Sequence, residues 1–383
     1  LIPLIRRRLT IGARLSQTPA PTSPPPGDAV VEAASDPQPP IPTALTNPYT
    51  PGKRVSHDAM FFGREEERAQ IEQKLSAGAH VAIIGARTVG SSSLLYHVAK
   101  TMETREGILV AHIDLKDPTF HSVAGLLNSI WSQWWGRVRP DNLVPARTLA
   151  EFVTAVRKLK AAGFRPLLFL DELEQMVWRA GTFDDPLFNA WHELGREDVM
   201  DFIVTAHDSP ADLLAQNGID SGFYELFQPS PLGLLERRAA DDLLTIPIRE
   251  AGLRIPDGAA ERLYLHAGPH PFFLQLAGYY LFDALAKGTY SQGEVVRRFE
   301  MAAEPYWQEM WETLSPLAQD HYPTSLRRES GGMGGRQLRI LANRGLVIPD
   351  EDGFRPFSGG FAAWLVRMKA ALQAAADIAP TPI

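Results

Sequence analysis

Short apolar runs alternate with longer amphipathic segments through the first two thirds of the chain. The runs are bounded by glycine, proline or charged residues, as buried strands of a parallel sheet are, and they cover residues 80–84, 108–113, 166–170 and 201–205. Helical periodicity occupies the intervals, at residues 64–76, 92–102, 121–135, 148–162 and 186–195. Strands that alternate with helices predict an α/β fold in which helices cover both faces of a parallel sheet.

Beyond residue 232 the pattern becomes helical, with segments at 236–251, 257–266, 271–286 and 291–302. Further helices are then followed by two strand-like segments, 345–348 and 354–357, around a turn rich in acids. Two helices followed by a β-hairpin are typical of a winged helix. We therefore expect a sheet-containing core, a helical lid, a winged-helix domain and a tail, over residues 47–231, 232–303, 304–368 and 369–383.

The first 46 residues contain ten prolines and almost no periodic apolar pattern. Such a segment cannot bury enough surface to offset the entropy lost on ordering, so we interpret it as a disordered linker. The chain begins at Leu1 rather than methionine, which is compatible with a longer protein. Residues 1–8 place apolar residues before basic ones, the reverse of a secretory signal. A terminal tail and the remnant of an upstream effector domain or anchor both remain open.

Composition narrows the classes of partner. The net charge is −7, so no global positive field attracts nucleic acid or an anionic membrane. The absence of cysteine excludes disulfides and cysteine-ligated zinc, and it is compatible with a cytoplasmic location. No apolar run reaches the roughly 20 residues that a membrane-spanning helix needs, so we expect no transmembrane segment.

A glycine-rich segment, Gly85-Ala-Arg-Thr-Val-Gly90-Ser91-Ser92, joins the first predicted strand to the next helix. This is the context of a phosphate-binding P-loop, whose backbone N–H groups and helix N-terminus bind phosphate. The motif requires Gly-x4-Gly-Lys-Ser/Thr, and Ser91 occupies the lysine position. Ser92 provides the hydroxyl that binds Mg²⁺ in such loops. A glycine-rich turn without a ligand is the alternative.

Two acids, Asp171 and Glu172, follow the third predicted strand, two strands after the glycine-rich segment. An apolar strand that ends in Asp-Glu matches the Walker B motif of P-loop ATPases. There the first acid holds Mg²⁺, and the second orients the attacking water. Paired acids after a strand also cap helix N-termini, which is the alternative interpretation.

The segment Phe61-Phe-Gly63-Arg64-Glu-Glu-Glu67, followed by a strand, the glycine-rich turn and Leu94-Leu95, resembles the start of prokaryotic STAND and related AAA+ ATPases. The resemblance implies a P-loop NTPase core that binds ATP or ADP with Mg²⁺. It also places Gly63 and Arg64 near the nucleotide base. The alternative is that Gly63 and Arg64 have a structural role alone, as a turn and the start of a helix.

Further segments continue this resemblance. Thr205-Ala206-His207 occupies the place of a polar sensor, and Gly268-Pro-His270-Pro271 is similar to the lid motif that lies against the nucleotide. Pro271 also suits the first turn of any helix. The resemblance implies that Glu172 orients water and that Ser92 and Asp171 hold Mg²⁺. The implied nucleotide-binding residues are Gly63, Arg64, Gly85, Gly90, Ser91, Ser92, Ser93, His207, His270 and Pro271.

Basic residues cluster before the predicted hairpin, at Arg327, Arg328, Arg336, Arg339 and Arg344. The helix at this position reads the major groove in DNA-binding winged helices. Five residues that include four glycines, 331–335, and the acidic turn 350–352 speak against strong DNA binding. We favour a structural module or one that contacts a protein partner.

The leading hypothesis is a STAND-type nucleotide-binding signalling switch with impaired hydrolysis, because Ser91 cannot neutralise phosphate charge as lysine does. It would act on a protein partner or an N-terminal effector domain, and it could form a homo-oligomer. A DNA-associated AAA+ ATPase and a scaffolding pseudo-ATPase are the alternatives.

Overall fold

The computed structural model describes residues 45–138, 148–179, 181–316, 318–319, 322, 341–350 and 353–378. Residues 1–44 of the expected linker, most of the basic cluster and the glycine-rich residues 331–335 lie outside these ranges. Among the described residues, no helix is both long enough and apolar enough to span a membrane.

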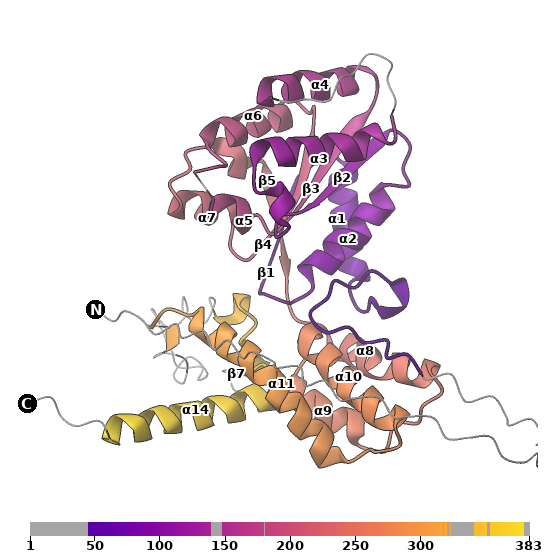
Figure 1. Cartoon of the computed structure of the whole chain (residues 1–383), viewed down its shortest axis with the longest axis vertical. Coiled ribbons are helices and arrows are strands. Elements are labelled where there is room, and N and C mark those ends of the chain that lie inside the picture. The colour runs from indigo at the N-terminus through magenta and orange to yellow at the C-terminus, as the bar shows by residue number, and fades with distance from the viewer. Residues whose placement is uncertain are drawn as a thin grey trace, which may run out of the picture. The chain divides into compact units, whose positions relative to one another are not determined.

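A five-stranded parallel sheet organises the first half of the structure (Figure 1). The strand order is β2-β3-β4-β1-β5, and every neighbouring pair is parallel. The sheet confirms the predicted α/β fold, and it brings the carboxyl ends of all its strands to one edge. The strands are β1 (His80–Gly85), β2 (Ile108–Asp114), β3 (Arg165–Asp171), β4 (Asp201–Ala206) and β5 (Phe227–Leu232).

Side chains that alternate along each strand pack into two separate cores, one on each face of the sheet. Val81 and Ile83 of β1 pack with the helices that precede and follow this strand, whereas Ala82 packs with the helices of the opposite face. The first group is α1 (Glu65–Ser76) and α2 (Ser91–Met102). The second group is α3 (Val123–Trp135), α4 (Leu149–Ala161), α5 (Glu174–Val177), α6 (Asp185–Arg196) and α7 (Pro210–Gln216).

The fifth strand, β5, is not apparent from the sequence pattern. It contains Pro229 and Pro231, which cannot donate ladder hydrogen bonds. The strand pairs only with β1 and forms an edge of the sheet, so the missing donors leave no gap in a neighbouring ladder. From β5 the chain runs directly into the helical lid.

The remaining elements share a single hydrophobic core. Phe273 in the lid packs against Trp307 and Phe357, which lie beyond residue 303. Helix α11 runs without a break past residue 303, where the sequence predicts a boundary. The elements are α8 (Arg237–Glu250), α9 (Ala259–Ala267), α10 (Pro271–Ala286), α11 (Gln292–Glu312), β6 (Val347–Asp350), β7 (Gly353–Pro356) and α14 (Gly359–Ile378).

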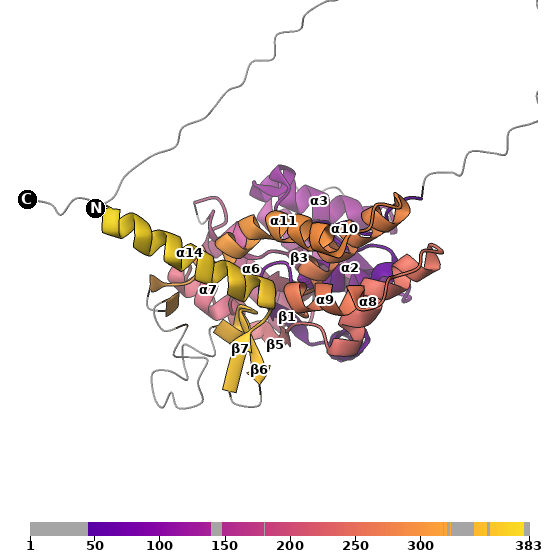
Figure 2. The same ribbon diagram turned by 90° about the horizontal axis from the view of Figure 1, so that it is seen from below.

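The predicted C-terminal hairpin is confirmed, since β6 and β7 pair antiparallel. Figure 2 shows this hairpin beside α14, a helix that the sequence pattern does not predict. The helix expected before the hairpin falls mostly on residues 323–340, outside the described ranges. The winged-helix domain therefore stays a prediction, as do the other domain boundaries.

A segment ahead of α1 connects the lid to the core. The buried Tyr49 hydroxyl donates to the carbonyls of Leu243 and Leu244 in α8, at 3.1 and 2.9 Å. A few residues later, the Val55 N–H donates to Ser93 Oγ at the start of α2 (3.0 Å). This segment thus contacts both the lid and the core, next to the glycine-rich turn.

Candidate nucleotide-binding site

A cavity of about 330 Å³ lies where the carboxyl edge of the sheet faces the lid. Its volume is within the range of small-ligand sites, roughly 300–1,000 Å³. The walls come from residues 50, 52–55, 60–62 and 86–93, from the ends of β3 and β4, and from α10 and α11. Eight of the binding and catalytic residues expected from the sequence line this cavity: Arg64, Gly90, Ser91, Ser92, Ser93, Glu172, His207 and Pro271.

The turn between β1 and α2 has a P-loop backbone. Gly90 adopts the left-handed conformation with φ of 103°, which glycine tolerates best, and α2 begins at the next residue. A Cβ atom on Gly85 would lie 2.8 Å from Val89 Cγ1 and 2.9 Å from the Leu232 carbonyl oxygen, so only glycine fits there. The helix N-terminus opens into the cavity, with Ser91 as its first residue. This position favours an anion.

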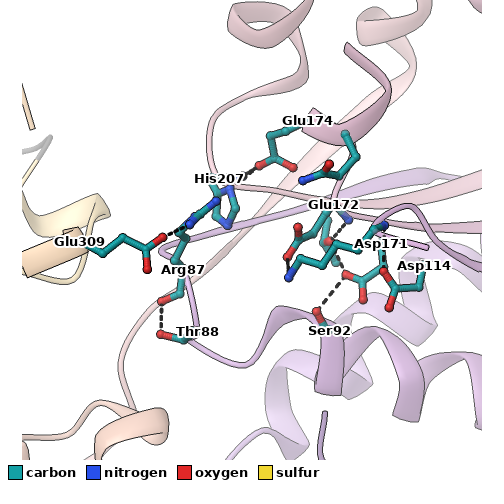
Figure 3. Close-up of polar contacts among 12 residues, drawn as sticks. Arg87, Thr88, Ser92, Asp114, Asp171, Glu172, Glu174, His207 and Glu309 are labelled. Atoms are coloured by element: carbon teal, nitrogen blue, oxygen red, sulfur yellow. Dashed lines mark hydrogen bonds and ion pairs between the residues drawn. The ribbon is translucent and has the colours of Figure 1, made fainter. Parts of the chain in front are cut away.

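Asp171 meets Ser92 at the end of the sheet, as the two motifs predict (Figure 3). The Ser92 hydroxyl donates to Asp171 Oδ1 at 3.0 Å, and the Thr205 hydroxyl donates to the same oxygen at 2.7 Å. Asp171 is 3% exposed. Neither acid caps the short helix that follows, whose N-cap is Leu173 without a side-chain bond. The capping alternative therefore does not describe these acids.

Burial raises the pKa of Asp171 to about 6, although the hydroxyls of Thr205 and Ser92 oppose the shift. The nearby charges of Asp114 and Glu172 raise it further. A buried carboxyl that is hard to ionise favours a cation beside it. The Ser92 hydroxyl and the Asp171 carboxylate are oxygen donors of the kind that Mg²⁺ prefers.

No cluster of three or more His, Cys, Asp or Glu suited to a metal occurs within the described ranges. Magnesium at nucleotide sites is usually held by one or two protein oxygens together with phosphate oxygens and water. The pair Ser92 and Asp171 therefore fits Mg²⁺ that arrives with a nucleotide, rather than an ion held by protein groups alone.

The raised pKa of Asp171 makes stability depend on pH. Because the folded-state pKa lies above the unfolded one, ionisation destabilises the fold as pH rises, and the penalty is absent at low pH. Between about pH 4 and pH 6, we expect the free energy of unfolding of the ligand-free protein to fall by about 2 kcal/mol relative to that of Asp171→Asn. Urea unfolding at several pH values measures this. A constant difference between wild type and Asp171→Asn across this pH range would contradict the raised pKa.

Glu172 occupies an unusual backbone conformation with φ of 63°. Its N–H donates to Thr205 Oγ1 at 2.8 Å, which holds the residue in this strained region. The side chain is 14% exposed and forms an ion pair with Lys116, which follows β2. The carboxylate therefore faces the cavity beside Asp171, the place of a residue that could orient water.

His207 follows β4 and contacts an acid that the sequence does not single out. The ring Nδ1 of His207 lies 2.6 Å from Glu174 Oε1, and the backbone N–H of His207 also donates to this oxygen. Burial disfavours the charged form of Glu174, but the hydrogen bonds and charge of His207 outweigh it and lower the pKa of the carboxyl. The pair fixes the ring at the cavity wall, where a polar sensor could contact a ligand.

Arg64 is buried and links three parts of the site. Its guanidinium donates to Glu67 Oε1 (2.7 Å), to the carbonyl of Val89 in the P-loop (3.3 Å) and to the carbonyl of Gly233 (2.6 Å). Gly233 lies between β5 and α8, so Arg64 ties the phosphate-binding turn to the start of the lid. Gly63 packs against Ala239 of α8 and is not part of the cavity wall.

The two lid residues differ in position. Pro271 begins α10 and lines the cavity. His270 does not line it and is fully buried beside Phe273 and Phe357, with ring centroids 4.9 and 5.8 Å away. Burial, aided by the charge of Arg64, lowers the pKa of His270 to about 3. The ring is therefore a neutral packing element, and the structure does not bring it to the other expected binding residues.

Two ion pairs join the core to the C-terminal half. Arg87 of the P-loop pairs with Glu309 of α11 (Figure 3). Arg344, which the sequence groups with possible DNA contacts, lies 3.0 Å from Asp208 Oδ2 and lines the cavity. In each pair an arginine that lines the cavity binds an acid from the other half of the structure.

Comparison with known proteins agrees with this geometry. The model of the family described as Novel STAND NTPase 1 matches residues 54–300. The chain belongs to this family. The match covers the sheet, the P-loop, the acid pair and most of the lid. A search of curated proteins found no match.

Solved structures show that the STAND protein shares the fold of P-loop ATPases. The Walker-type ATPase of Pyrococcus abyssi is 14% identical with a TM-score of 0.58, and the alignment covers 82% of this chain and 99% of that one. The ORC2 protein of Aeropyrum pernix, solved as ADPNP–ADP complexes, is also 14% identical. Its TM-score is 0.50, with 86% of this chain and 98% of that one covered. At this identity the likeness concerns the fold alone.

The sequence does not single out three residues of the site. Thr205 lies in the segment predicted to hold a polar sensor, but its own role is seen only here, where its hydroxyl donates to Asp171 and accepts from the Glu172 N–H. Lys116 and Glu174 lie in a turn and a one-turn helix that show no periodic pattern. A polar residue at the end of each parallel strand is the available signal, and at β2, which ends in Asp114, it points to the region of Lys116.

Proposed function

We propose that this STAND protein is a nucleotide-binding regulatory switch that holds ATP or ADP with Mg²⁺ and hydrolyses ATP slowly or not at all. The observation that carries the proposal is that Ser92 and Thr205, which line the end of the cavity opposite the lid, both donate to the buried Asp171 directly behind them. The family match supports an NTPase core, and the geometry supports the site.

Different residues of the site would bind the phosphates, the Mg²⁺ ion and the attacking water. The N–H groups of residues 86–91 and the α2 N-terminus bind phosphate, and Ser92 with Asp171 would hold Mg²⁺. Bound Mg²⁺ would supply charge neutralisation at the phosphates. Glu172 is placed to orient water, but Ser91 offers no cation to the transition state. Binding without efficient turnover is the expected consequence.

The ion pair between Arg87 and Glu309 supports coupling between nucleotide and lid. Its side chains are 43% and 51% exposed, and such surface pairs contribute only about 0–1 kcal/mol. A bound phosphate would compete with Glu309 for Arg87 and so shift the position of α11 relative to the P-loop. A ligand changes a conformational equilibrium when it binds the two states with different affinity. A protein partner or an upstream effector domain would read this change.

The proposal is tested by nucleotide titration, phosphate release and hydrogen exchange on the same protein. We expect micromolar or weaker Mg-ATP binding, little phosphate release, and altered exchange over α11 when nucleotide is present. Absence of binding would reject the switch and favour a scaffold. Binding without any change in α11 would reject only the coupling. Salt-dependent DNA affinity in the same preparation would favour the DNA-associated alternative.

A further inference from the structure

Most basic groups of the cavity wall already have a partner. The arginines at positions 64, 87 and 344 are held by the acids and carbonyl groups described above. The guanidinium of Arg54 lies 4.6 Å from the centre of the Tyr96 ring. Within the described residues, the basic side chains that line the cavity are Lys53, Arg54, Arg64, Arg87, Lys116 and Arg344. Arg87 is the group proposed above to exchange Glu309 for a phosphate, and the two lysines are the further side chains of this wall that are free to move to a ligand.

Lys116 is placed at the phosphate end of the cavity. It lies just past β2, and its N–H donates to Asp114 Oδ1 at 3.1 Å, which fixes the backbone of the turn. Asp114 is the register partner of Asp171 on the neighbouring strand. The ammonium group reaches back across this strand end to pair with Glu172. It therefore stands beside the acids that mark the expected metal and water positions.

We propose that Lys116 supplies the cation that the P-loop lacks at Ser91. When a nucleoside triphosphate occupies the cavity, its ammonium group leaves Glu172 and contacts the terminal phosphate. The inference rests on the proposed nucleotide binding and adds to it a residue outside the P-loop motif.

Three features of Lys116 suit this role. Its side chain is 60% exposed although Glu172 is 14% exposed, so a phosphate in the cavity can reach the ammonium group and compete with the carboxylate for it. A lysine ammonium is a compact charge on a flexible stem, which can bind phosphate from different directions. The charge of Glu172 keeps the ammonium near the site before the ligand arrives. Lys53 starts from the lid side, because it follows Gly52, which lies against Phe272.

The test compares Mg-ATP and adenosine affinity by calorimetry in wild type and in Lys116→Ala. We expect ATP binding to weaken about tenfold, the value of one hydrogen bond to a charged group less the cost of breaking the existing pair. Adenosine affinity should not change, because adenosine has no phosphate. Lys116→Arg should retain most of the ATP affinity. Lys158→Ala, which removes an exposed lysine of α4, is the matched control. An unchanged thermal midpoint shows that each variant is folded.

A second background separates contact with phosphate from simple neutralisation of Glu172. In Glu172→Gln there is no acid charge left to neutralise and no ion pair to break, so Lys116→Ala should weaken ATP binding by about tenfold or more if the ammonium contacts phosphate. Loss of the effect in that background would overturn the inference. A loss of affinity in Lys53→Ala but not in Lys116→Ala would also overturn it, in favour of the other lysine.

The two proposals fail in different ways. If wild type binds neither ATP nor ADP, the proposed function itself is rejected. If wild type binds ATP and Lys116→Ala binds it equally well, the function stands and only the role of Lys116 is rejected.

Discussion

Replacing Ser91 with lysine is expected to tighten ATP binding by roughly 10- to 150-fold. A hydrogen bond to a charged group contributes about 1.5–3 kcal/mol, and each 1.4 kcal/mol changes affinity tenfold. Ser91 is the first residue of α2 and lines the cavity, so the new side chain starts where the P-loop lysine of other ATPases does. Titration with ATP, ADP and adenosine measures the gain, which should shrink as phosphates are removed.

The control is Ser91→Met, which adds a long side chain without charge. It should not tighten binding, and a gain there would mean that burial rather than charge is responsible. The background also matters, because Lys116 is proposed to supply a cation already. We expect Ser91→Lys to increase ATP affinity less in the wild-type protein than in Lys116→Ala.

Turnover gives a stricter test of the same residue. The lysine stabilises charge on the transferred phosphoryl group, so Ser91→Lys is the variant in which hydrolysis that depends on Glu172 should appear first. Rapid hydrolysis by the wild-type protein, abolished in Glu172→Gln, would contradict the idea that Ser91 impairs catalysis. It would show that another cation, with Lys116 the first candidate, performs the role of the missing lysine.

The sequence predicts the centre of the site well because parallel strands impose strong constraints. Residues that follow buried strands meet at one edge of the sheet. The strand pattern alone therefore brings Ser92 to Asp171. The partners of those residues depend on side-chain direction within irregular turns. No periodicity reports that Lys116 turns back to Glu172, or that Glu174 faces His207 from a helix of one turn.

The lid shows a different limit of the sequence pattern. The predicted helix 291–302 continues to Glu312, although Pro305 lies inside it. Proline in a helix interior removes a hydrogen bond and usually ends or kinks the helix. Trp307 and Trp311 beyond it are buried in the common core, and this packing outweighs the local preference. Such tertiary contacts between distant segments cannot be found from local periodicity.

Changing Arg64 to alanine is expected to lower the free energy of unfolding by about 3–4 kcal/mol. The guanidinium is buried, and its loss leaves the buried Val89 carbonyl without this donor and also removes the part-buried bond to the Gly233 carbonyl. A buried polar group without its partner costs about 1–3 kcal/mol, and the charge-assisted bond to Glu67 is lost as well. Urea unfolding measures the change. Arg64→Lys should recover only part of it, because one ammonium cannot match the fork of a guanidinium.

Arg68 provides the matched control, because it lies in the first turn of α1, the helix that Arg64 directly precedes. Its guanidinium lies 3.6 Å from Glu72 with the side chain 38% exposed, so Arg68→Ala should cost less than about 1 kcal/mol. The comparison also decides between two roles for Arg64. A contact with the nucleotide base, as the family resemblance implies, would change the preference between adenine and guanine nucleotides with little effect on unfolding. The observed bonds predict the opposite result: a large loss of stability, weaker binding of every nucleotide because the P-loop is released from the start of the lid, and an unchanged preference between bases.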